Sequence, residues 1–298
     1  MRLQVRIANG ALGVILNTFF RSSYSAKWKR WNFDFLAGVS QEKLARKYPA
    51  AKFESVQLGP VAAEVVVATP HPQWELFYLH GGGYTMGSLK AYRRNALRLA
   101  FRLNARVTLV DYRLAPECPF PAALEDSVAA YQAFLTQTSP EKIVMGGDSA
   151  GGGLALATLL YLRDHNIPLP VKAFCLSAWT DLTASGESVL SNRRKDCWLS
   201  QRSLQIWGAK YYGAESARHP YVSPVFGSYQ RIPPVFLLVG DQEVLQDDSL
   251  RVAERIGSAG GSAQLWLGKD MQHNWPFSLP FLPESKAAMK ALSEFIHS

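Results

Sequence analysis

Residues 142–153 read KIVMGGDSAGGG, and this stretch decides how the rest of the chain is interpreted. A strand-forming run leads into it, and a helix-forming run, LALATLLYL, follows it. Ser149 therefore stands between an expected strand and an expected helix, with Gly147 two residues before it and Gly151 two residues after it. Glycines at these positions permit a sharp turn that lifts one serine clear of the sheet. The pattern G-x-S-x-G predicts a nucleophile. A phosphate loop of the Walker type is excluded, because no G-x-x-x-x-G-K-[ST] occurs.

Outward from this turn, strands alternate with helices of ten or more residues. This rhythm predicts a mostly parallel sheet with helices on both faces. Residues 53–59 and 62–70 are expected to form an antiparallel strand pair that precedes it. The further strands are expected at 75–80, 105–112, 142–147, 171–177, 234–240 and 263–268. The helices are expected at 90–104, 121–137, 150–164, 246–259 and 284–297.

Two segments fall outside this rhythm. Residues 180–232 are long, polar and aromatic, with one expected helix at 200–212, and are interpreted as a cap segment. Residues 1–50 are expected to supply the other part of the cap, as helices over about 3–20 and 26–47. Apolar residues at positions 5, 8, 12, 15, 16 and 19 have the spacing of one buried helical stripe. Residues 51–298 then form the catalytic domain.

A serine hydroxyl needs a base that takes its proton. On a fold of this kind the order along the chain is serine, then a carboxylate, then histidine. His273 follows the last expected strand, in the loop DMQHNW, and is the predicted base. His219 lies in the cap segment and His297 is the penultimate residue, so both fit less well.

The carboxylate is expected after the strand at 234–240. Asp241 follows that strand directly, where active sites of α/β folds form, and is the predicted acid. Spacing alone does not separate it from its near neighbours Glu243, Asp247 and Asp248.

An acyl transfer also needs N–H donors for the negative charge that develops on the carbonyl oxygen. The residue after the nucleophile, Ala150, is one expected donor. The others are expected in HGGGY, residues 80–84, which follows the strand at 75–80.

Composition excludes several other classes of protein. The formal charge of +8 arises entirely in residues 1–52, which hold ten Lys or Arg and two Asp or Glu. A nucleic-acid binder would spread its basic residues over a folded face, so no nucleic-acid partner is expected.

No stretch reaches the length of a membrane-spanning helix, and stable membrane insertion is not expected. Three widely spaced cysteines favour a reducing, cytoplasmic location, and the six histidines form no metal-binding motif.

Together, HGGGY (80–84), YRLAPE (112–117), GDSAGG (147–152), DQEVLQDD (241–248) and the His273 loop resemble the bacterial hormone-sensitive-lipase-like carboxylesterases. The resemblance covers about residues 53–298. It implies an α/β-hydrolase fold with a helical cap, Ser149 as nucleophile and His273 as base. It places Asp241 at the first aspartate of the family's D-P-L-x-D motif. It also implies that the backbone N–H groups of Gly82, Gly83 and Ala150 form the oxyanion hole.

The expected function is therefore hydrolysis of short- to medium-chain acyl esters through an acyl-enzyme, with no metal or organic cofactor. The same side chains could serve a lactonase, deacetylase or amidase. A non-catalytic, ligand-binding member of the fold is the alternative from another class, and measurable turnover would separate it from an enzyme. A small-molecule ester is the expected partner, and a homodimer would be usual for the family.

Overall fold

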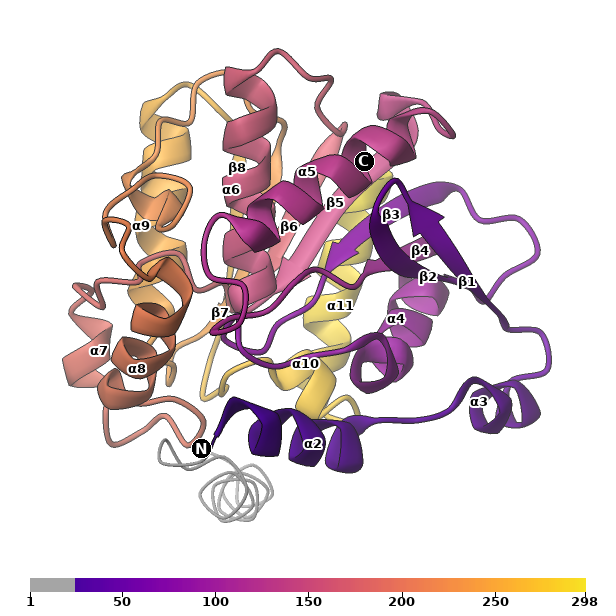
Figure 1. The fold of residues 1–298 in the computed structure, drawn as a ribbon, viewed down its shortest axis with the longest axis horizontal. Helices are drawn as coiled ribbons and strands as arrows, with labels where there is room; N and C mark the ends of the chain where they lie inside the picture. Colours follow the sequence, from indigo (N-terminus) through magenta and orange to yellow (C-terminus); the bar gives the residue numbers. More distant parts are fainter. Residues whose placement is uncertain (1–24) are drawn as a thin grey trace.

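The computed structural model describes residues 25–298, and its centre is an eight-stranded sheet in the order β1-β2-β4-β3-β5-β6-β7-β8 (Figure 1). The strands are β1 (Lys52–Leu58), β2 (Val61–Val67), β3 (Trp74–Leu79), β4 (Ala105–Val110), β5 (Ile143–Asp148), β6 (Lys172–Leu176), β7 (Val235–Gly240) and β8 (Ala263–Gly268). The longer helices are α2 (Ala26–Ala37), α3 (Gln41–Lys47), α4 (Leu89–Leu103), α5 (Ala122–Leu135), α6 (Ala150–Asp164), α8 (Gln201–Tyr212), α9 (Gln246–Ser258) and α11 (Pro283–His297). Each strand expected after residue 50 is present, so the predicted mostly parallel α/β fold is confirmed.

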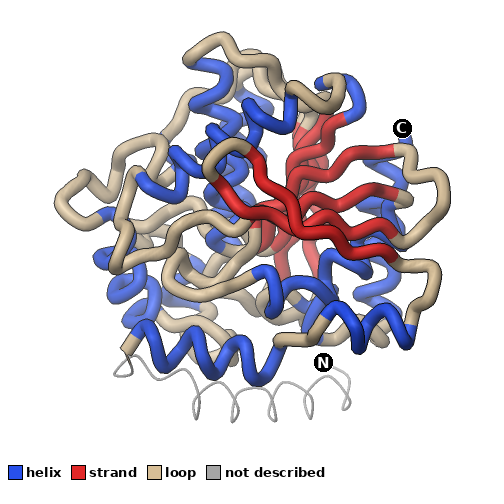
Figure 2. The backbone as a smooth tube through the Cα atoms, turned by 45° about the vertical axis from the view of Figure 1, so that its right-hand side comes forward, coloured by secondary structure: helices blue, strands red, loops and turns tan. Residues whose placement is uncertain are grey.

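The sheet brings the ends of several strands to one edge. From β4 to β8 all neighbouring strands are parallel, and β1 and β2 pair antiparallel at the other end. Figure 2 shows these strands as one twisted sheet with helices around it. Parallel strands place their carboxyl ends together, so the loops after β3, β5, β7 and β8 meet at the same edge. These loops carry the predicted site residues.

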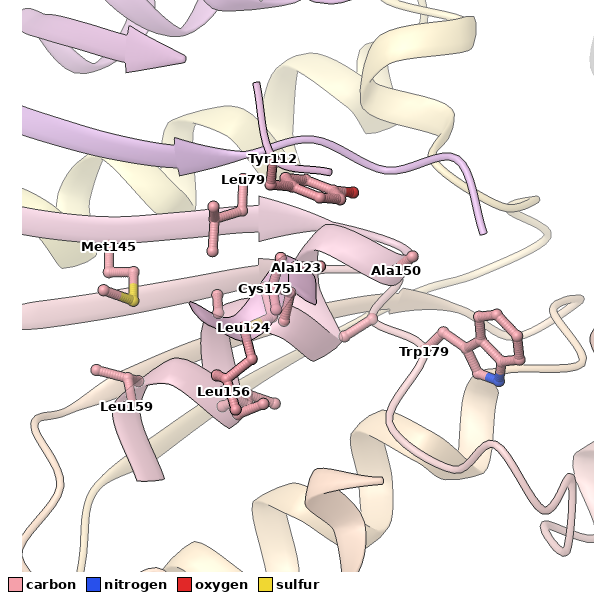
Figure 3. Close-up of a cluster of buried hydrophobic side chains, with 14 of the residues drawn as sticks. Leu79, Tyr112, Ala123, Leu124, Met145, Ala150, Leu156, Leu159, Cys175 and Trp179 are labelled. Atoms are coloured by element: carbon pink, nitrogen blue, oxygen red, sulfur yellow. The ribbon is translucent and has the colours of Figure 1, made fainter. Parts of the chain in front are cut away.

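Two hydrophobic cores lie on opposite faces of the sheet. One core contains side chains of α5, α6 and α9, and the other contains side chains of α4 and α11. In Figure 3, Leu156 and Leu159 of α6 and Leu124 of α5 gather against the strands that carry Leu79 and Met145. α6 is buried almost all round, which explains why its sequence is apolar rather than amphipathic.

The helix expected over residues 26–47 is wrong as one element, because the structure has two helices there. α2 ends at Ala37, and Gly38, its C-cap residue, is extended with φ −66° and ψ 140°. The side chain of Ser40 then accepts a hydrogen bond from the Lys43 N–H and begins α3. Glycine is a weak helix former and serine is a strong N-cap, so the break has a local cause. The helix expected over about 3–20 lies outside the described residues.

The segment 180–232 contains α7 (Ser188–Ser191), α8 and a 3-10 turn, η2 (Pro224–Phe226). α8 matches the predicted helix at 200–212 and begins with a capping box between Ser200 and Ser203. Asp248 of α9 fastens the start of the segment to the body, because its carboxylate accepts hydrogen bonds from the N–H groups of Thr180 and Asp181.

Arg30 fixes α2 above the loop that follows β3. Its guanidinium donates to the carbonyl oxygens of Thr85 at 2.8 Å and Ala115 at 2.7 Å, and it pairs with Glu117 at 2.6 Å. In Figure 1, α2 crosses the same side of the molecule as α8. The two helices are thereby placed around the carboxyl edge of the sheet. Within residues 25–298, no helix is both long and apolar enough to cross a bilayer.

Candidate active site

Ser149 occupies a strained turn between β5 and α6. Its backbone has φ 52° and ψ −123°, which is an unfavourable conformation for a residue with a side chain. Backbone hydrogen bonds hold the turn: the Ser149 N–H donates to the Leu176 carbonyl, and the Ser149 carbonyl accepts from the N–H groups of Gly153 and Trp179. The surrounding structure therefore imposes the strain and presents the hydroxyl in a fixed position.

The positions two residues before and two residues after Ser149 have no room for a side chain, which explains the glycines there. A Cβ on Gly147 would lie 2.3 Å from the carbonyl oxygen of Gly151, and a Cβ on Gly151 would lie 2.1 Å from that of Leu79. These atoms belong to the backbone and cannot move aside. The crowding predicted from the G-x-S-x-G pattern is thus found in the structure.

His273 lies between Ser149 and a carboxylate. Its Nε2 is 3.0 Å from the Ser149 Oγ, and its Nδ1 is 3.0 Å from Oε2 of Glu243. Ser149, Glu243 and His273 follow β5, β7 and β8, so along the chain they have the predicted order of serine, carboxylate and histidine. The structure therefore brings Ser149 and His273 together.

The expectation that Asp241 is the acid partner of His273 is wrong. Asp241 Oδ1 instead accepts hydrogen bonds from the Gln242 side chain at 2.7 Å and the Asp270 N–H at 2.8 Å. The chain turns back after β7, with the Glu243 N–H bonded to the Gly240 carbonyl, so the third residue after the strand faces the histidine. Asp247 and Asp248 bind backbone N–H groups of Ser188, Thr180 and Asp181.

Glu243 is buried and firmly held. Its Oε1 accepts from the Gly240 N–H at 2.6 Å and from the Ser177 hydroxyl at 2.8 Å, which leaves Oε2 for His273. A sequence signal for this role was available. Residues 243–247 read EVLQD and match D-P-L-x-D at the leucine and the final aspartate, which puts Glu243 at the motif's first position.

The surroundings of His273 favour its protonated form. Burial alone would lower the pKa of the imidazole, but the hydrogen bond and charge of Glu243, with the charges of Asp196 and Asp148, outweigh burial. The pKa of His273 is therefore raised above its ordinary value of 6.5. A histidine poised in this way can accept a proton from Ser149 and stabilise the resulting charge.

Three backbone N–H groups around Ser149 are available to a ligand. Gly82 and Gly83 have φ of 124° and 61°, in the region that favours glycine. Among the described residues, no hydrogen bond uses the N–H of Gly82 or Gly83, and Ala150 is the first residue of α6, where an N–H has no helical partner. Gly82 and Gly83 line the same cavity as Ser149, Ala150 follows it in the chain, and these N–H groups remain unbonded within the described residues.

Asp148, immediately before Ser149, ties these loops together and was not singled out from the sequence. Its Oδ1 accepts from the Tyr78 hydroxyl and the Gly81 N–H, and its Oδ2 accepts from the Tyr92 hydroxyl and the Asn274 amide. Burial is the main cause of a raised pKa at this carboxyl. Asp148 therefore joins the glycine loop to the His273 loop, and its place inside G-x-S-x-G was the available signal.

The YRLAPE segment supports the glycine loop. The Tyr112 hydroxyl donates to the His80 carbonyl at 2.6 Å, and the two rings stack with centroids 4.3 Å apart. Burial lowers the pKa of His80 to about 4, so its ring is neutral at pH 7. Arg113 pairs with Asp126 at the start of α5. This segment has the structural role expected of it.

A cavity of about 830 Å³ opens onto Ser149 and His273, within the size range of ligand sites. Its walls come from α2, α4, α8, α10 (Trp275–Ser278) and residues 193–200, and include the aromatic side chains of Phe33, Trp198, Trp207 and Phe277. In the described part of the chain, no three His, Cys, Asp or Glu side chains gather in a way that could hold a metal ion.

Comparison with known proteins places this geometry in a family. The alpha/beta hydrolase fold family matches residues 76–277, which span the glycine loop, Ser149, Glu243 and His273. The chain belongs to this family. Within it, the chain is a member of the bacterial hormone-sensitive lipase family of carboxylic ester hydrolases, as the relatives below show.

Among these relatives is an acetyl-hydrolase of Streptomyces hygroscopicus, 36% identical over 82% of this chain and 82% of its own length. A crystal structure of EstE5 soaked in ethyl alcohol is 34% identical and has a TM-score of 0.92, with 100% of this chain and 98% of that chain covered. An esterase from the bacterial hormone-sensitive lipase family is 34% identical with a TM-score of 0.89, covering 99% and 98%. This alpha/beta hydrolase therefore matches solved members of the family over nearly the full length of both chains.

Proposed function

We propose that the protein hydrolyses short- to medium-chain acyl esters with Ser149 as nucleophile, His273 as general base and Glu243 as the residue that orients the base. The observation that carries this proposal is the chain of contacts from Ser149 Oγ to His273 Nε2 and from His273 Nδ1 to Glu243, with Ser149 and His273 lining the cavity. The available triad argues against a purely ligand-binding role.

The reaction follows from these positions. His273 takes the Ser149 proton as the oxygen attacks the ester carbonyl, and the charge on the carbonyl oxygen is bound by the N–H groups of Gly82, Gly83 and Ala150. The imidazolium then gives its proton to the leaving alcohol, and an acyl-enzyme remains. Water attacks the acyl-enzyme with His273 again as base, which releases the acid and restores the serine.

Hydrolysis of p-nitrophenyl esters of increasing acyl length tests this proposal. We expect turnover of acetyl and butanoyl esters, because their acyl groups fit within an aromatic-walled cavity of about 830 Å³. The name of the Streptomyces relative, acetyl-hydrolase, makes the acetyl ester the first substrate to try. Folded protein that turns over no ester at any length would contradict the proposal.

The raised pKa of His273 sets the pH profile. His273 must be neutral to act as base, so activity is lost as the pH falls through its pKa. Because that pKa lies above 6.5, we expect the acid limb of kcat/KM to have its midpoint above this value. A midpoint at or below 6.5 would mean that Glu243 does not stabilise the imidazolium. An NMR titration of the His273 ring in the Ser149→Ala variant gives the same quantity independently of turnover.

Gly82→Ala is expected to lower kcat about 100-fold or more, the effect of losing one oxyanion donor. A Cβ at this position would lie 2.3 Å from the Met86 carbonyl oxygen, so the glycine loop must shift. Gly257→Ala on α9 is the matched control, because its Cβ would meet nothing within 4 Å. The control should keep full activity and gain stability, measured by thermal unfolding. Equal kcat values for the two variants would show that Gly82 does not contribute to the oxyanion hole.

A further inference from the structure

The cavity above Ser149 carries more positive charge than hydrolysis of a neutral ester requires. Four arginines line it, Arg94 and Arg98 from α4 and Arg193 and Arg202 from the cap segment. In the described residues, no carboxylate lies within ion-pair distance of any of the four, whereas the neighbouring Arg93 pairs with Glu64 at 2.6 Å. Among the described residues, all four arginines of the cavity therefore lack a carboxylate partner.

The two acidic residues that line the cavity do not neutralise this charge. Asp148 already accepts four hydrogen bonds from the protein. Asp196 accepts from the N–H groups of Trp198, Leu199 and Val244. The sequence of residues 1–24 contains no Asp or Glu, so that segment has no side-chain carboxylate to offer. The cavity thus presents guanidinium groups without a matching anion.

Arg98 is the least solvated of the four arginines, because Arg94, Arg193 and Arg202 are exposed and Arg98 is half-buried. Its Nη1 donates to neutral acceptors, the Phe277 carbonyl at 2.9 Å and the Asn95 side chain at 3.2 Å. Burial, and then the charge of Arg94 one helical turn away, lower the pKa of Arg98. Like charges at this spacing destabilise a helix, and a bound anion would remove that cost.

We propose that the preferred substrates are esters that carry a second, anionic group, which Arg98 and Arg94 bind while the ester carbonyl lies at Ser149. This inference rests on the proposed esterase function. The planar guanidinium suits a carboxylate or a phosphate, and its hydrogen bonds to an anion are stronger than those to a neutral group. Arg98 and Arg94 would then decide specificity without taking part in bond breaking.

The test compares esters of matched size. Monoethyl adipate and ethyl hexanoate differ by an anion in the acyl part, and O-butanoyl glycolate and ethyl butanoate differ by an anion in the alcohol part. In a pH-stat at low salt, we expect kcat/KM to favour the anionic member of at least one pair by about tenfold. The preference should fall toward one in Arg98→Gln and be reduced in Arg94→Gln. It should also weaken as the ionic strength rises to about 0.5 M.

Arg102→Gln is the matched control, since Arg102 is an exposed arginine of the same helix outside the cavity. It should keep the wild-type preference. Turnover of the neutral esters with no anionic preference, or a preference that Arg98→Gln and Arg94→Gln leave unchanged, would overturn this inference alone.

Loss of all ester turnover would instead contradict the proposed function. In that case, calorimetry of monoethyl adipate with the Ser149→Ala protein decides about the anion site. Binding that Arg98→Gln weakens about tenfold supports the site, and binding that is absent or independent of Arg98 contradicts it.

Discussion

Ser149→Ala is expected to lower kcat for p-nitrophenyl butanoate by about 10⁴- to 10⁶-fold, the range seen when a serine nucleophile is removed. The hydroxyl lies 3.0 Å from the base and is held by a turn that the backbone enforces. Alanine keeps the backbone and removes only the nucleophilic oxygen, so the fold should persist. Circular dichroism and thermal unfolding check that it does.

Ser258→Ala serves as the control, because Ser258 is an exposed serine at the end of α9. It should retain wild-type kcat. If Ser149→Ala kept more than about a tenth of the wild-type kcat, the nucleophile would lie elsewhere, since nucleophile loss costs far more than this.

Glu243→Gln and Asp241→Asn form the second large test, and they separate the residue found in the structure from the one predicted. Glu243→Gln keeps the shape of the side chain but removes the charge that orients and stabilises the His273 imidazolium. We expect kcat/KM to fall about 10³- to 10⁴-fold, as with other triad carboxylates. Asp241→Asn should change it by no more than about threefold, because Asp241 contacts Gln242 and Asp270 rather than His273.

The order of these two effects is the decisive result. A large loss in Asp241→Asn beside a small loss in Glu243→Gln would show that the carboxylate next to His273 is not the one that supports the base. Equal small losses would show that His273 needs no carboxylate. Both variants should be compared at one pH above the acid limb, so that a shifted pKa of His273 does not mimic a loss of function.

The sequence predicts those parts of the site that depend on local geometry. The turn at Ser149 could be predicted because Gly147 and Gly151 are required by contacts within a few residues and with the adjoining strand. His273 could be predicted because chain order left few other histidines. The glycine loop at residues 80–84 could be predicted because it follows a buried strand directly, and the family resemblance singled out Gly82 and Gly83 within it.

The carboxylate could not be fixed in the same way. Asp241 is the first acidic residue after β7, but the turn from Gly240 to Glu243 decides which side chain faces the histidine. Such a turn depends on a backbone hydrogen bond and on Ser177, a residue of another loop. The positive charge of the cavity could not be predicted from the sequence for a similar reason. Spacing shows that Arg94 and Arg98 share one face of α4, but not that this face borders Ser149.

The central claim is that His273 activates Ser149, and covalent labelling tests it most directly. The protein is treated with phenylmethylsulfonyl fluoride, digested and analysed by peptide mass spectrometry, beside an identically treated His273→Ala variant. We predict one sulfonyl adduct on Ser149 in the wild type, formed in parallel with the loss of ester hydrolysis, and almost none in the variant. An adduct on another residue that accompanies inactivation, or inactivation with Ser149 unmodified, would contradict the account.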